Sequence, residues 1–375
     1  MKFVLAPDKF KDSLSGLEFC EAAKEGLLKV FPKANIVFCP LADGGDGTIE
    51  VVNYFLTGEL VTTEVKNPFF KAIKATYLYA SDSRIAFIEM AEASGLKLLE
   101  VQERDCKNTS TLGTGQLIVD AIKRGAKEII LGIGGSATND CGIGMATAFG
   151  YRFLDKNGKE LEPIGANLSK IVCIDDSQVA TTFQNVVFKI ACDVTNPLYG
   201  KNGAAYVYAK QKGANEYDIK LLDQGLENFS KVLDEKFHVK SQEIIGGGAA
   251  GGMGVGTMLF LNGELVPGIT LLKELAGFED KIKDADWIIT GEGKLDEQTL
   301  FGKTIKGVMD DAKQNNINVA AFCGLLDLTE IQLKQFGISY ADEVFHKADN
   351  LEDAMNNAGK YVSIIAEEFA KMLKK

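Results

Sequence analysis

The stretch that decides the fold is residues 2–13, which read KFVLAPDKFKDS. The mainly apolar residues 2–6 predict a short buried strand, and the loop after them leads into a helix expected over 17–30. Ser13 or Ser15 would cap that helix at its N-terminus. The next apolar run predicts a second strand. The order strand, helix, strand indicates an α/β fold with a parallel sheet.

Similar patterns continue along the chain. Apolar runs predict strands over residues 35–40, 84–90, 128–133, 185–192, 285–290 and 319–324. Helical spacing predicts helices over residues 304–314 and 350–375. Residues 61–78 instead alternate in short segments. The glycine-rich residues 246–256 predict a loop in which backbone segments approach closely, because glycine does not favour a regular helix or strand.

These patterns predict two unlike α/β domains. The two ends of the chain, residues 1–62 and 285–375, would build one sheet, and residues 63–284 would form a large inserted second domain. A length of 375 residues is enough for two domains.

Composition narrows the classes of partner and compartment. The formal net charge of -11 argues against a nucleic acid or an anionic membrane as partner, because such a surface repels phosphate backbones. No apolar run reaches the roughly 18 residues of a membrane span. The seven cysteines are odd in number and lack C-x-x-C spacing, so no disulfide framework or zinc site is expected. A reducing, cytoplasmic location fits this pattern.

Four loops rich in carboxylates, most of them also rich in glycine, follow predicted strands. They are residues 6–13, 42–48, 132–140 and 290–304. Ligands of open α/β sheets bind outside the carboxyl ends of the strands. The recurrence of such loops therefore predicts a phosphate and metal site at one edge of a sheet, although each loop alone could be a solvated turn.

The first two loops suit phosphate and Mg2+. Lys9 and Lys11 stand beside Asp8 just before a helix, whose N-terminus favours anions. Asp43 and Asp46 lie among glycines, where carboxylate oxygens can reach a hard cation next to bare backbone. The alternatives are a solvated loop with a capping serine and a tight turn with exposed acids.

The other two loops leave more than one interpretation. In residues 132–140 the glycine amides could approach phosphate, with hydrogen bonds from Ser136, Thr138 and Asn139. The same residues match G-x-G-x-x-A, the dinucleotide fingerprint, with Asp155 as partner of the ribose. This alternative is an NAD-dependent hydroxy-acid oxidoreductase. A sugar-acid sensor without catalytic activity is a third hypothesis.

The last loop ends in Gly302-Lys303-Thr304, like a P-loop. A Walker A loop is excluded, because Glu297 stands where that motif has glycine. Glu292, Asp296 and Lys303 remain as a candidate cluster of two acids and a base.

The chain resembles the bacterial glycerate kinase family, type I, over nearly its whole length. The resemblance rests on six motifs in the family's order, at residues 6–11, 42–48, 134–140, 192–198, 248–254 and 291–303. Three residues depart from the commonest family pattern: Asp12 replaces glycine, Asp46 replaces glutamate and Cys141 replaces a smaller residue.

The resemblance implies a discontinuous Rossmann-like (flavodoxin-like) domain, a second inserted α/β domain and an active site in the cleft between them. It implies ATP, Mg2+ and D-glycerate, with 2-phosphoglycerate expected as the product rather than 3-phosphoglycerate, in glycerate catabolism. The expected partners are therefore small molecules, and a homodimer is left open.

From the motifs and the resemblance together we expect three groups of site residues. The catalytic residues are Asp43, Asp193, Asp296 and Lys9. The residues that bind substrate or phosphate are Asp8, Lys11, Ser13, Gly44, Gly45, Gly134, Gly135, Ser136, Asn139, Asp140, Glu292, Gln298 and Lys303. The metal ligands are Asp43, Asp46 and Asp193. Spacing does not tell the general base from the metal ligands.

Overall fold

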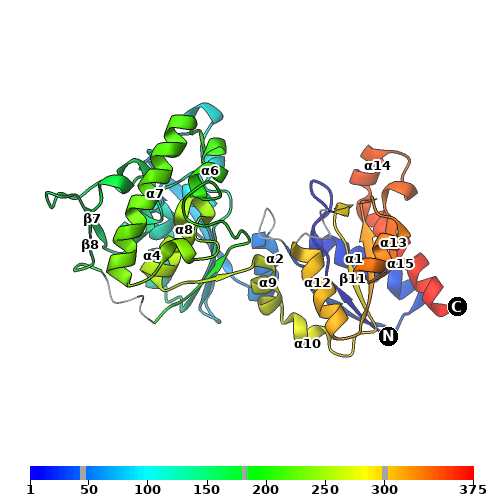
Figure 1. Cartoon of the computed structure of the whole chain (residues 1–375). Helices are drawn as coiled ribbons and strands as arrows, with labels where there is room; N and C mark the ends of the chain where they lie inside the picture. The colour runs from blue at the N-terminus through cyan, green and yellow to red at the C-terminus, as the bar shows by residue number, and fades with distance from the viewer. Residues whose placement is uncertain (43–47, 180–182, 184, 298–302) are drawn as a thin grey trace. The chain divides into compact units, whose positions relative to one another are not determined.

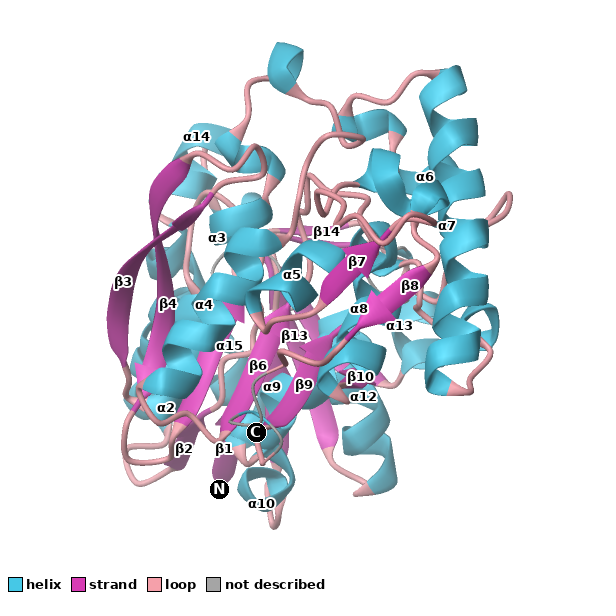
Figure 2. Cartoon of the chain, turned by 90° about the vertical axis from the view of Figure 1, so that its left-hand side faces the viewer, coloured by secondary structure: helices cyan, strands magenta, loops and turns pink. Residues whose placement is uncertain are grey.

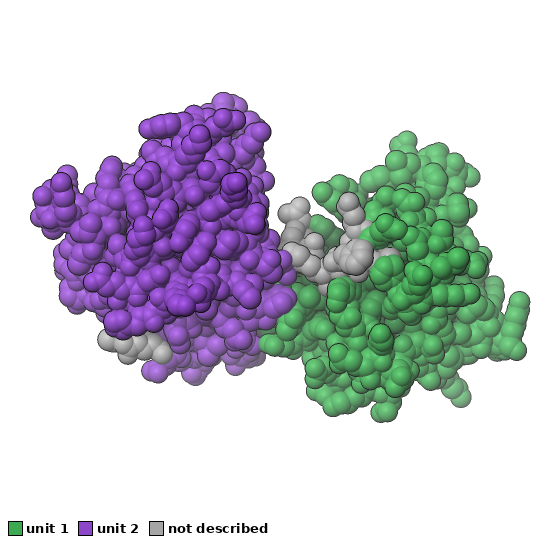
Figure 3. Space-filling view, viewed as in Figure 1, with its two compact units in different colours: residues 1–55, 268–375 green, residues 56–267 purple. Residues whose placement is uncertain are grey.

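The structure is a computed structural model that describes residues 1–42, 48–179, 183, 185–297 and 303–375. The chain forms two compact units (Figure 3), of which unit 1 comprises residues 1–55 and 268–375 and unit 2 comprises residues 56–267. Both are built from sheets and helices, which confirms the mixed α/β class.

Unit 1 contains a five-stranded parallel sheet. Its strands are β1 (Lys2–Leu5), β2 (Asn35–Phe38), β11 (Trp287–Thr290), β13 (Asn318–Cys323) and β15 (Ile338–Glu343), in the spatial order β15-β13-β11-β1-β2. This is the flavodoxin-like order, with the first two strands of the unit exchanged at one end. The direction of the connections reverses between β1 and β11, and ligands of such sheets bind at that switch point.

Helices complete unit 1 (Figure 1). They are α1 (Gly16–Val30), α2 (Thr48–Leu56), α9 (Gly268–Ala276), α10 (Phe278–Ile282), α12 (Lys303–Gln314), α13 (Glu330–Phe336), α14 (Leu351–Asn356) and α15 (Ala358–Lys374). Ser15 caps α1 in a capping box with Glu18. The expected single C-terminal helix is in fact two helices, which are separated at Asn357.

The boundary of unit 1 lies earlier than residue 285 because α9 packs on α12. The ammonium of Lys273 on α9 forms an ion pair of 2.7 Å with the carboxylate of Asp311 on α12. Gly307 of α12 faces Ile269, and a Cβ there would lie 2.8 Å from that side chain. Residues 268–284 therefore fold with the second half of the unit 1 sheet.

Unit 2 contains a six-stranded mixed sheet (Figure 2). Its strands are β3 (Glu59–Lys66), β4 (Ala72–Ala80), β5 (Ile85–Glu89), β6 (Glu128–Gly132), β9 (Val187–Ala191) and β10 (Glu264–Val266), in the order β10-β9-β6-β5-β4-β3. The four strands β10, β9, β6 and β5 are parallel to one another. In contrast, β4 pairs antiparallel with β5, and β3 pairs antiparallel with β4. The carboxyl ends of β6 and β9 are therefore neighbours, since Gly132 pairs with Ala191.

The remaining elements of unit 2 are helices and a small strand pair. The helices are α3 (Ala91–Ser94), α4 (Leu112–Lys123), α5 (Ile143–Ala148), α6 (Ala204–Tyr208), α7 (Glu216–Phe237) and α8 (Ala249–Leu261). The pair is β7 (Arg152–Leu154) with β8 (Cys173–Asp175), and a second short pair in unit 1 is β12 (Lys294–Leu295) with β14 (Leu325–Leu326). Short 3-10 turns include η5 (Lys210–Lys212) and η7 (Phe345–Lys347).

The expectation of a loop over residues 246–256 is wrong from Ala249 onward, where α8 begins. Ala250, Gly251 and Gly252 have φ angles of 53°, 76° and 92°, so the start of α8 is kinked into the left-handed region. Gly251 lies so close to the backbone of Thr138 that a Cβ would be 2.2 Å from its carbonyl oxygen. The glycines thus permit both the kink and the contact.

No helix in the described part of the chain is both long and apolar enough to cross a bilayer.

Candidate functional site

A cavity of about 720 Å3 lies in unit 1 at the carboxyl ends of its parallel strands. The loops that follow β1, β11, β13 and β15 all contribute to its wall. Five of the expected site residues line it, namely Asp8, Lys9, Lys11, Ser13 and Glu292. The structure thus brings the first and the fourth of the carboxylate-bearing loops together at the switch point of the sheet.

Asp8 joins three segments at this cavity. Its backbone N–H donates to the carbonyl of Gly291 at 2.8 Å, which ties the loop after β1 to the loop after β11. Its carboxylate accepts hydrogen bonds from the backbone N–H of Lys9 at 2.7 Å and from the hydroxyl of Thr304 at 2.8 Å. Since Thr304 lies in the first turn of α12, the carboxylate is held at the start of that helix.

The lysines of the cavity differ in their partners. Lys294 forms ion pairs of 3.1 Å with both Asp296 and Asp327, and these carboxylates raise the pKa of its ammonium. Lys9 and Lys11 form no ion pair with another described residue. Two positive charges without carboxylate partners among the described residues make this end of the cavity attractive to an anion.

Ser13 and Asp296 have internal partners at the edge of this site. The hydroxyl of Ser13 donates to the carbonyl of Met355 at 2.6 Å, which connects the loop after β1 to α14. Asp296 follows β12 and is held by Lys294, but it does not line the cavity. Glu292, two residues after β11, does line the cavity.

A second group of expected residues lies in unit 2, in the loop after β6. Gly134 and Gly135 are exposed, whereas Ser136, Asn139 and Asp140 are buried. Asp193 follows β9, the strand beside β6, and so lies at the same edge of the sheet. The exposed glycine amides are available to an anion, as in other loops that bind phosphate.

Asp140 holds this loop from inside. Its carboxylate accepts four hydrogen bonds, from the backbone N–H and the hydroxyl of Thr111 and from the N–H groups of Gly142 and Gly144. Burial raises the pKa of this carboxyl, and the donated hydrogen bonds oppose that shift. All its acceptor positions serve the fold of the loop.

Asn139 is different, because it is fully buried and neither its amide nitrogen nor its amide oxygen has a hydrogen-bond partner among the described residues. A buried amide without hydrogen-bond partners lowers the free energy of unfolding by an amount on the order of 1–3 kcal/mol. Such a group suits a contact with a polar ligand.

Lys212 is a residue of this site that sequence reasoning missed. Its side chain is 2% exposed, and its ammonium donates to the hydroxyl of Ser136 and to the carbonyl of Thr138, both at 2.7 Å. It lies 76 residues further along the chain than Ser136, inside Lys210-Gln211-Lys212. No signal in that stretch distinguishes it from a surface lysine.

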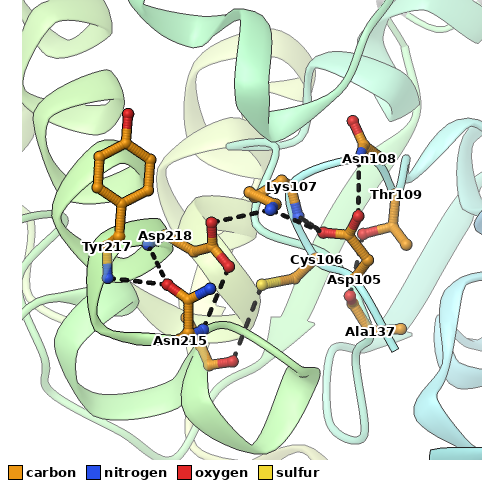
Figure 4. A network of polar contacts seen from close by, with 10 residues as sticks. Asp105, Cys106, Lys107, Asn108, Thr109, Ala137, Asn215, Tyr217 and Asp218 are labelled. Carbon is orange, nitrogen blue, oxygen red and sulfur yellow. Dashed lines mark hydrogen bonds and ion pairs between the residues drawn. The ribbon is translucent and has the colours of Figure 1, made fainter. Parts of the chain in front are cut away.

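The segment before α4 supports the same loop (Figure 4). The hydroxyl of Thr109 donates to the carbonyl of Ala137 at 3.0 Å, and the ammonium of Lys107 forms an ion pair of 2.8 Å with Asp218 at the start of α7. Asn215 caps α7. The loop that contains Ser136 and Asn139 is therefore tied to the segment before α4, and that segment is in turn tied to α7.

Several expected residues cannot be placed. Asp43, Gly44, Gly45, Asp46 and Gln298 lie outside the described residues, and only the backbone of Lys303, at the start of α12, is described. The described residues contain no group of three or more histidine, cysteine or acidic side chains that could hold a metal ion.

The dinucleotide fingerprint at residues 132–137 does not have its required structure. In that motif the glycine turn leads directly into a helix whose N-terminus meets the pyrophosphate. Here α5 begins only at Ile143 and has six residues. The carboxylate of Asp155 accepts hydrogen bonds from the backbone N–H groups of Asn157 and Lys159 in a tight turn.

We expect the stability of unit 2 to depend on pH through Lys212. Burial lowers the pKa of its ammonium to about 8, so between pH 8 and the ordinary lysine pKa the unfolded chain binds more protons than the folded chain. The stability contributed by this residue therefore rises with pH in that window, by about 2 kcal/mol between pH 7.5 and 9.5.

The measurement is the thermal unfolding of wild type and Lys212→Met over this pH range. The unfolding temperature of wild type should rise relative to that of Lys212→Met as the pH rises. The exposed Lys220→Met on α7 is the control, and its curve should run parallel to that of wild type. A parallel curve for Lys212→Met would contradict the expectation.

Known proteins of one family match this chain over nearly its full length. A family model described as the glycerate kinase family matches residues 3–374. A glycerate kinase of Halalkalibacterium halodurans is 42% identical over 367 residues, which cover 98% of this chain and 97% of the relative. The glycerate 2-kinase of Escherichia coli K12 is 40% identical over 358 residues, or 96% of this chain and 94% of the relative.

A solved structure is similar as well. The crystal structure of the "putative glycerate kinase 2" from Salmonella typhimurium LT2 superposes with a TM-score of 0.90 at 40% identity, covering 100% of this chain and 98% of that one.

Proposed function

The chain belongs to the glycerate kinase family and phosphorylates glycerate, and from this premise we propose that it transfers the γ-phosphoryl group of ATP to the 2-hydroxyl of D-glycerate with Mg2+. The observation in the structure that carries the proposal is the pair Lys9 and Lys11. These lysines face a cavity at the switch point of the unit 1 sheet, beside Asp8 and Glu292.

Phosphoryl transfer asks a protein mainly for positioning and for positive charge near the transferred group. Lys9 and Lys11 supply that charge, and neither is neutralised by a described carboxylate. Asp8 is held by hydrogen bonds from Thr304 and from the N–H of Lys9, so the loop that carries both lysines is tied to the start of α12. Charge placed in advance costs no reorganisation during the reaction.

The residues present are compatible with Mg2+. This ion needs one or two carboxylates when phosphate oxygens complete its coordination. Asp8 and Glu292 face the same cavity, and Asp43, Asp46 and Asp193 are the ligands expected from the sequence. Bound there, the ion would neutralise charge on the phosphate oxygens.

The proton of the attacking hydroxyl goes to a carboxylate. Asp43, Asp193 and Asp296 are the candidates for this general base. In unit 2, the amides of Gly134 and Gly135 and the amide of Asn139, which has no hydrogen-bond partner among the described residues, are the groups suited to an anionic, hydroxyl-bearing ligand.

The NAD-dependent oxidoreductase is not supported, because full-length relatives are named glycerate kinases and the glycine fingerprint lacks its helix. We also propose that the protein is cytoplasmic and forms a homodimer.

The test is a coupled assay of ADP release with ATP, Mg2+ and D-glycerate, with L-glycerate as the control acceptor. We expect turnover with D-glycerate, and we expect the phosphorus NMR signal of the product to be a doublet, because carbon 2 carries one proton. A phosphorus signal split by the two protons of carbon 3 would overturn the proposed position of transfer. No ADP release with D-glycerate would overturn the donor or the acceptor.

A further inference from the structure

We propose that the apolar wall of the unit 1 cavity binds the purine nucleoside of the phosphoryl donor, with the phosphates at the lysine end. This inference rests on the proposed function, since it places the base of the same nucleotide whose phosphates Lys9 and Lys11 would hold. It assigns a binding site for an apolar, planar group to a cavity that also carries charged side chains.

The wall consists of apolar side chains that are unusually exposed. Leu325, Phe345, Leu351 and Met355 are large hydrophobic residues with 38–63% of their surface accessible, and all four line this one cavity. They come from β14, η7 and α14, which are separate segments. Exposed hydrophobic residues scattered singly need no explanation, but a contiguous group in a cavity marks a binding site.

Glycerate does not match this wall. It is a small acid with two hydroxyls, so it has no apolar surface with which to cover leucine, methionine and phenylalanine side chains. A volume of about 720 Å3 lies within the range of roughly 300–1,000 Å3 typical of pockets for larger ligands. The occupant must therefore be larger than glycerate and partly apolar.

Positive charge lies on another part of the cavity wall. Lys9 and Lys11 lie on the loop after β1, whereas Phe345 and Leu351 follow β15, which is separated from β1 by β13 and β11 in the sheet. One occupant must then combine a strongly anionic part with a flat apolar part. A purine nucleoside triphosphate has both, and its base can stack on an aromatic ring such as that of Phe345.

Hydrogen bonds within unit 1 hold the segments of the wall in place. The backbone N–H of Phe345 donates to the carbonyl of Gly324 at 3.0 Å, and the N–H of Val344 donates to that of Cys323 at 2.9 Å. The hydroxyl of Ser13 holds the carbonyl of Met355 at 2.6 Å, which fixes α14 to the loop that carries the lysines. A preformed site binds without the cost of ordering its own segments.

The direct test follows the methyl group of Met355 by NMR in the full-length protein with 13C-methyl methionine. Adenosine, which has no phosphate, should shift the Met355 signal in a saturable manner, and D-glycerate should not. Met372 on α15 is the control, because it is 45% exposed but does not line the cavity. Met355→Leu assigns the signal.

A kinetic test uses Phe345→Ala, with Ile331→Ala on α13 as the matched control. Ile331 is 71% exposed in the same unit and lies outside the cavity. Loss of the stacking surface should raise the KM for ATP about tenfold and leave the KM for glycerate unchanged. The control should change neither constant.

The outcomes separate this inference from the proposed function. If the enzyme turns over ATP with glycerate while adenosine leaves Met355 unmoved, the inference is wrong and the function stands. If adenosine shifts Met355 but no ADP forms with glycerate, the nucleoside site stands and the function is wrong. A Met355 signal that shifts with protein concentration but not with adenosine would show that a second copy of the chain covers the wall. That result would overturn the inference.

Discussion

Replacing Lys9 with methionine should lower kcat/KM with ATP and D-glycerate by about 10²- to 10³-fold, the range found when one preorganised electrostatic group is removed from an active site. The methionine keeps the length and the apolar stem of the side chain but removes the ammonium. Lys9 lines the unit 1 cavity and forms no ion pair with another described residue, so its charge is available to the phosphates. The loss should therefore appear in catalysis rather than in folding.

The measurement is steady-state kinetics of ADP release, together with the midpoint of thermal unfolding. Lys24→Met is the matched control, because Lys24 lies on α1, is 43% exposed and pairs with Glu21. Its kinetics should equal those of wild type. A Lys9→Met enzyme within threefold of wild type, with an unchanged midpoint, would remove Lys9 from the proposed mechanism.

Replacing Gly251 with alanine should destabilise unit 2 by about 3 kcal/mol or more. The φ angle of 76° costs a non-glycine residue about 1–2 kcal/mol. In addition, the new Cβ would lie 2.2 Å from the carbonyl oxygen of Thr138 and 2.6 Å from the Cα of Asn139, so the backbone must move. Overpacking of this kind typically costs a further 1–3 kcal/mol.

Gly158→Ala is the control that isolates the backbone term. Gly158 has a φ angle of 77°, but no atom lies within 4 Å of the position of its Cβ. We expect it to cost about 1 kcal/mol. Unfolding should be followed by circular dichroism, because the single tryptophan, Trp287, lies in β11 of unit 1. Equal losses for the two variants would mean that the contact between α8 and the Asn139 loop contributes nothing.

Gly251→Ala should also reduce activity, since the displaced backbone is that of the loop containing Ser136 and Asn139. Because the same contact supports both the fold and the loop, activity should be compared at a temperature where the variant is still folded.

Residues 2–13 predicted their own structure well, for a local reason. An apolar run of four residues, Phe3 to Ala6, followed by proline and charges has few alternatives to a buried strand that ends in a loop. The cap at Ser15 follows from the glutamate three residues later, which completes a capping box. Likewise, the apolar runs at 128–133 and 319–324 coincide with β6 and β13, because continuous apolar runs suit strands covered on both faces.

Prediction failed where a residue's role depends on distant neighbours. The glycines of residues 246–256 disfavour a helix locally. In the folded unit they nevertheless form part of α8, where other segments pack closely against them and the helix start adopts left-handed φ angles. The exposed apolar wall of unit 1 was also missed, since Leu325, Phe345 and Leu351 come from separate segments.

By itself, the sequence determined the α/β class and most strands of the two large sheets, although not β10 and β15, because hydrophobic periodicity and turn residues act over a few neighbouring positions. Tertiary structure alone decided which loops meet. It brought Asp8 and Glu292 to one cavity, placed Lys212 under Ser136 and left the Asn139 amide buried without a described partner. Such contacts arise from the order of strands in a sheet and from packing between segments far apart in the chain, which local patterns do not encode.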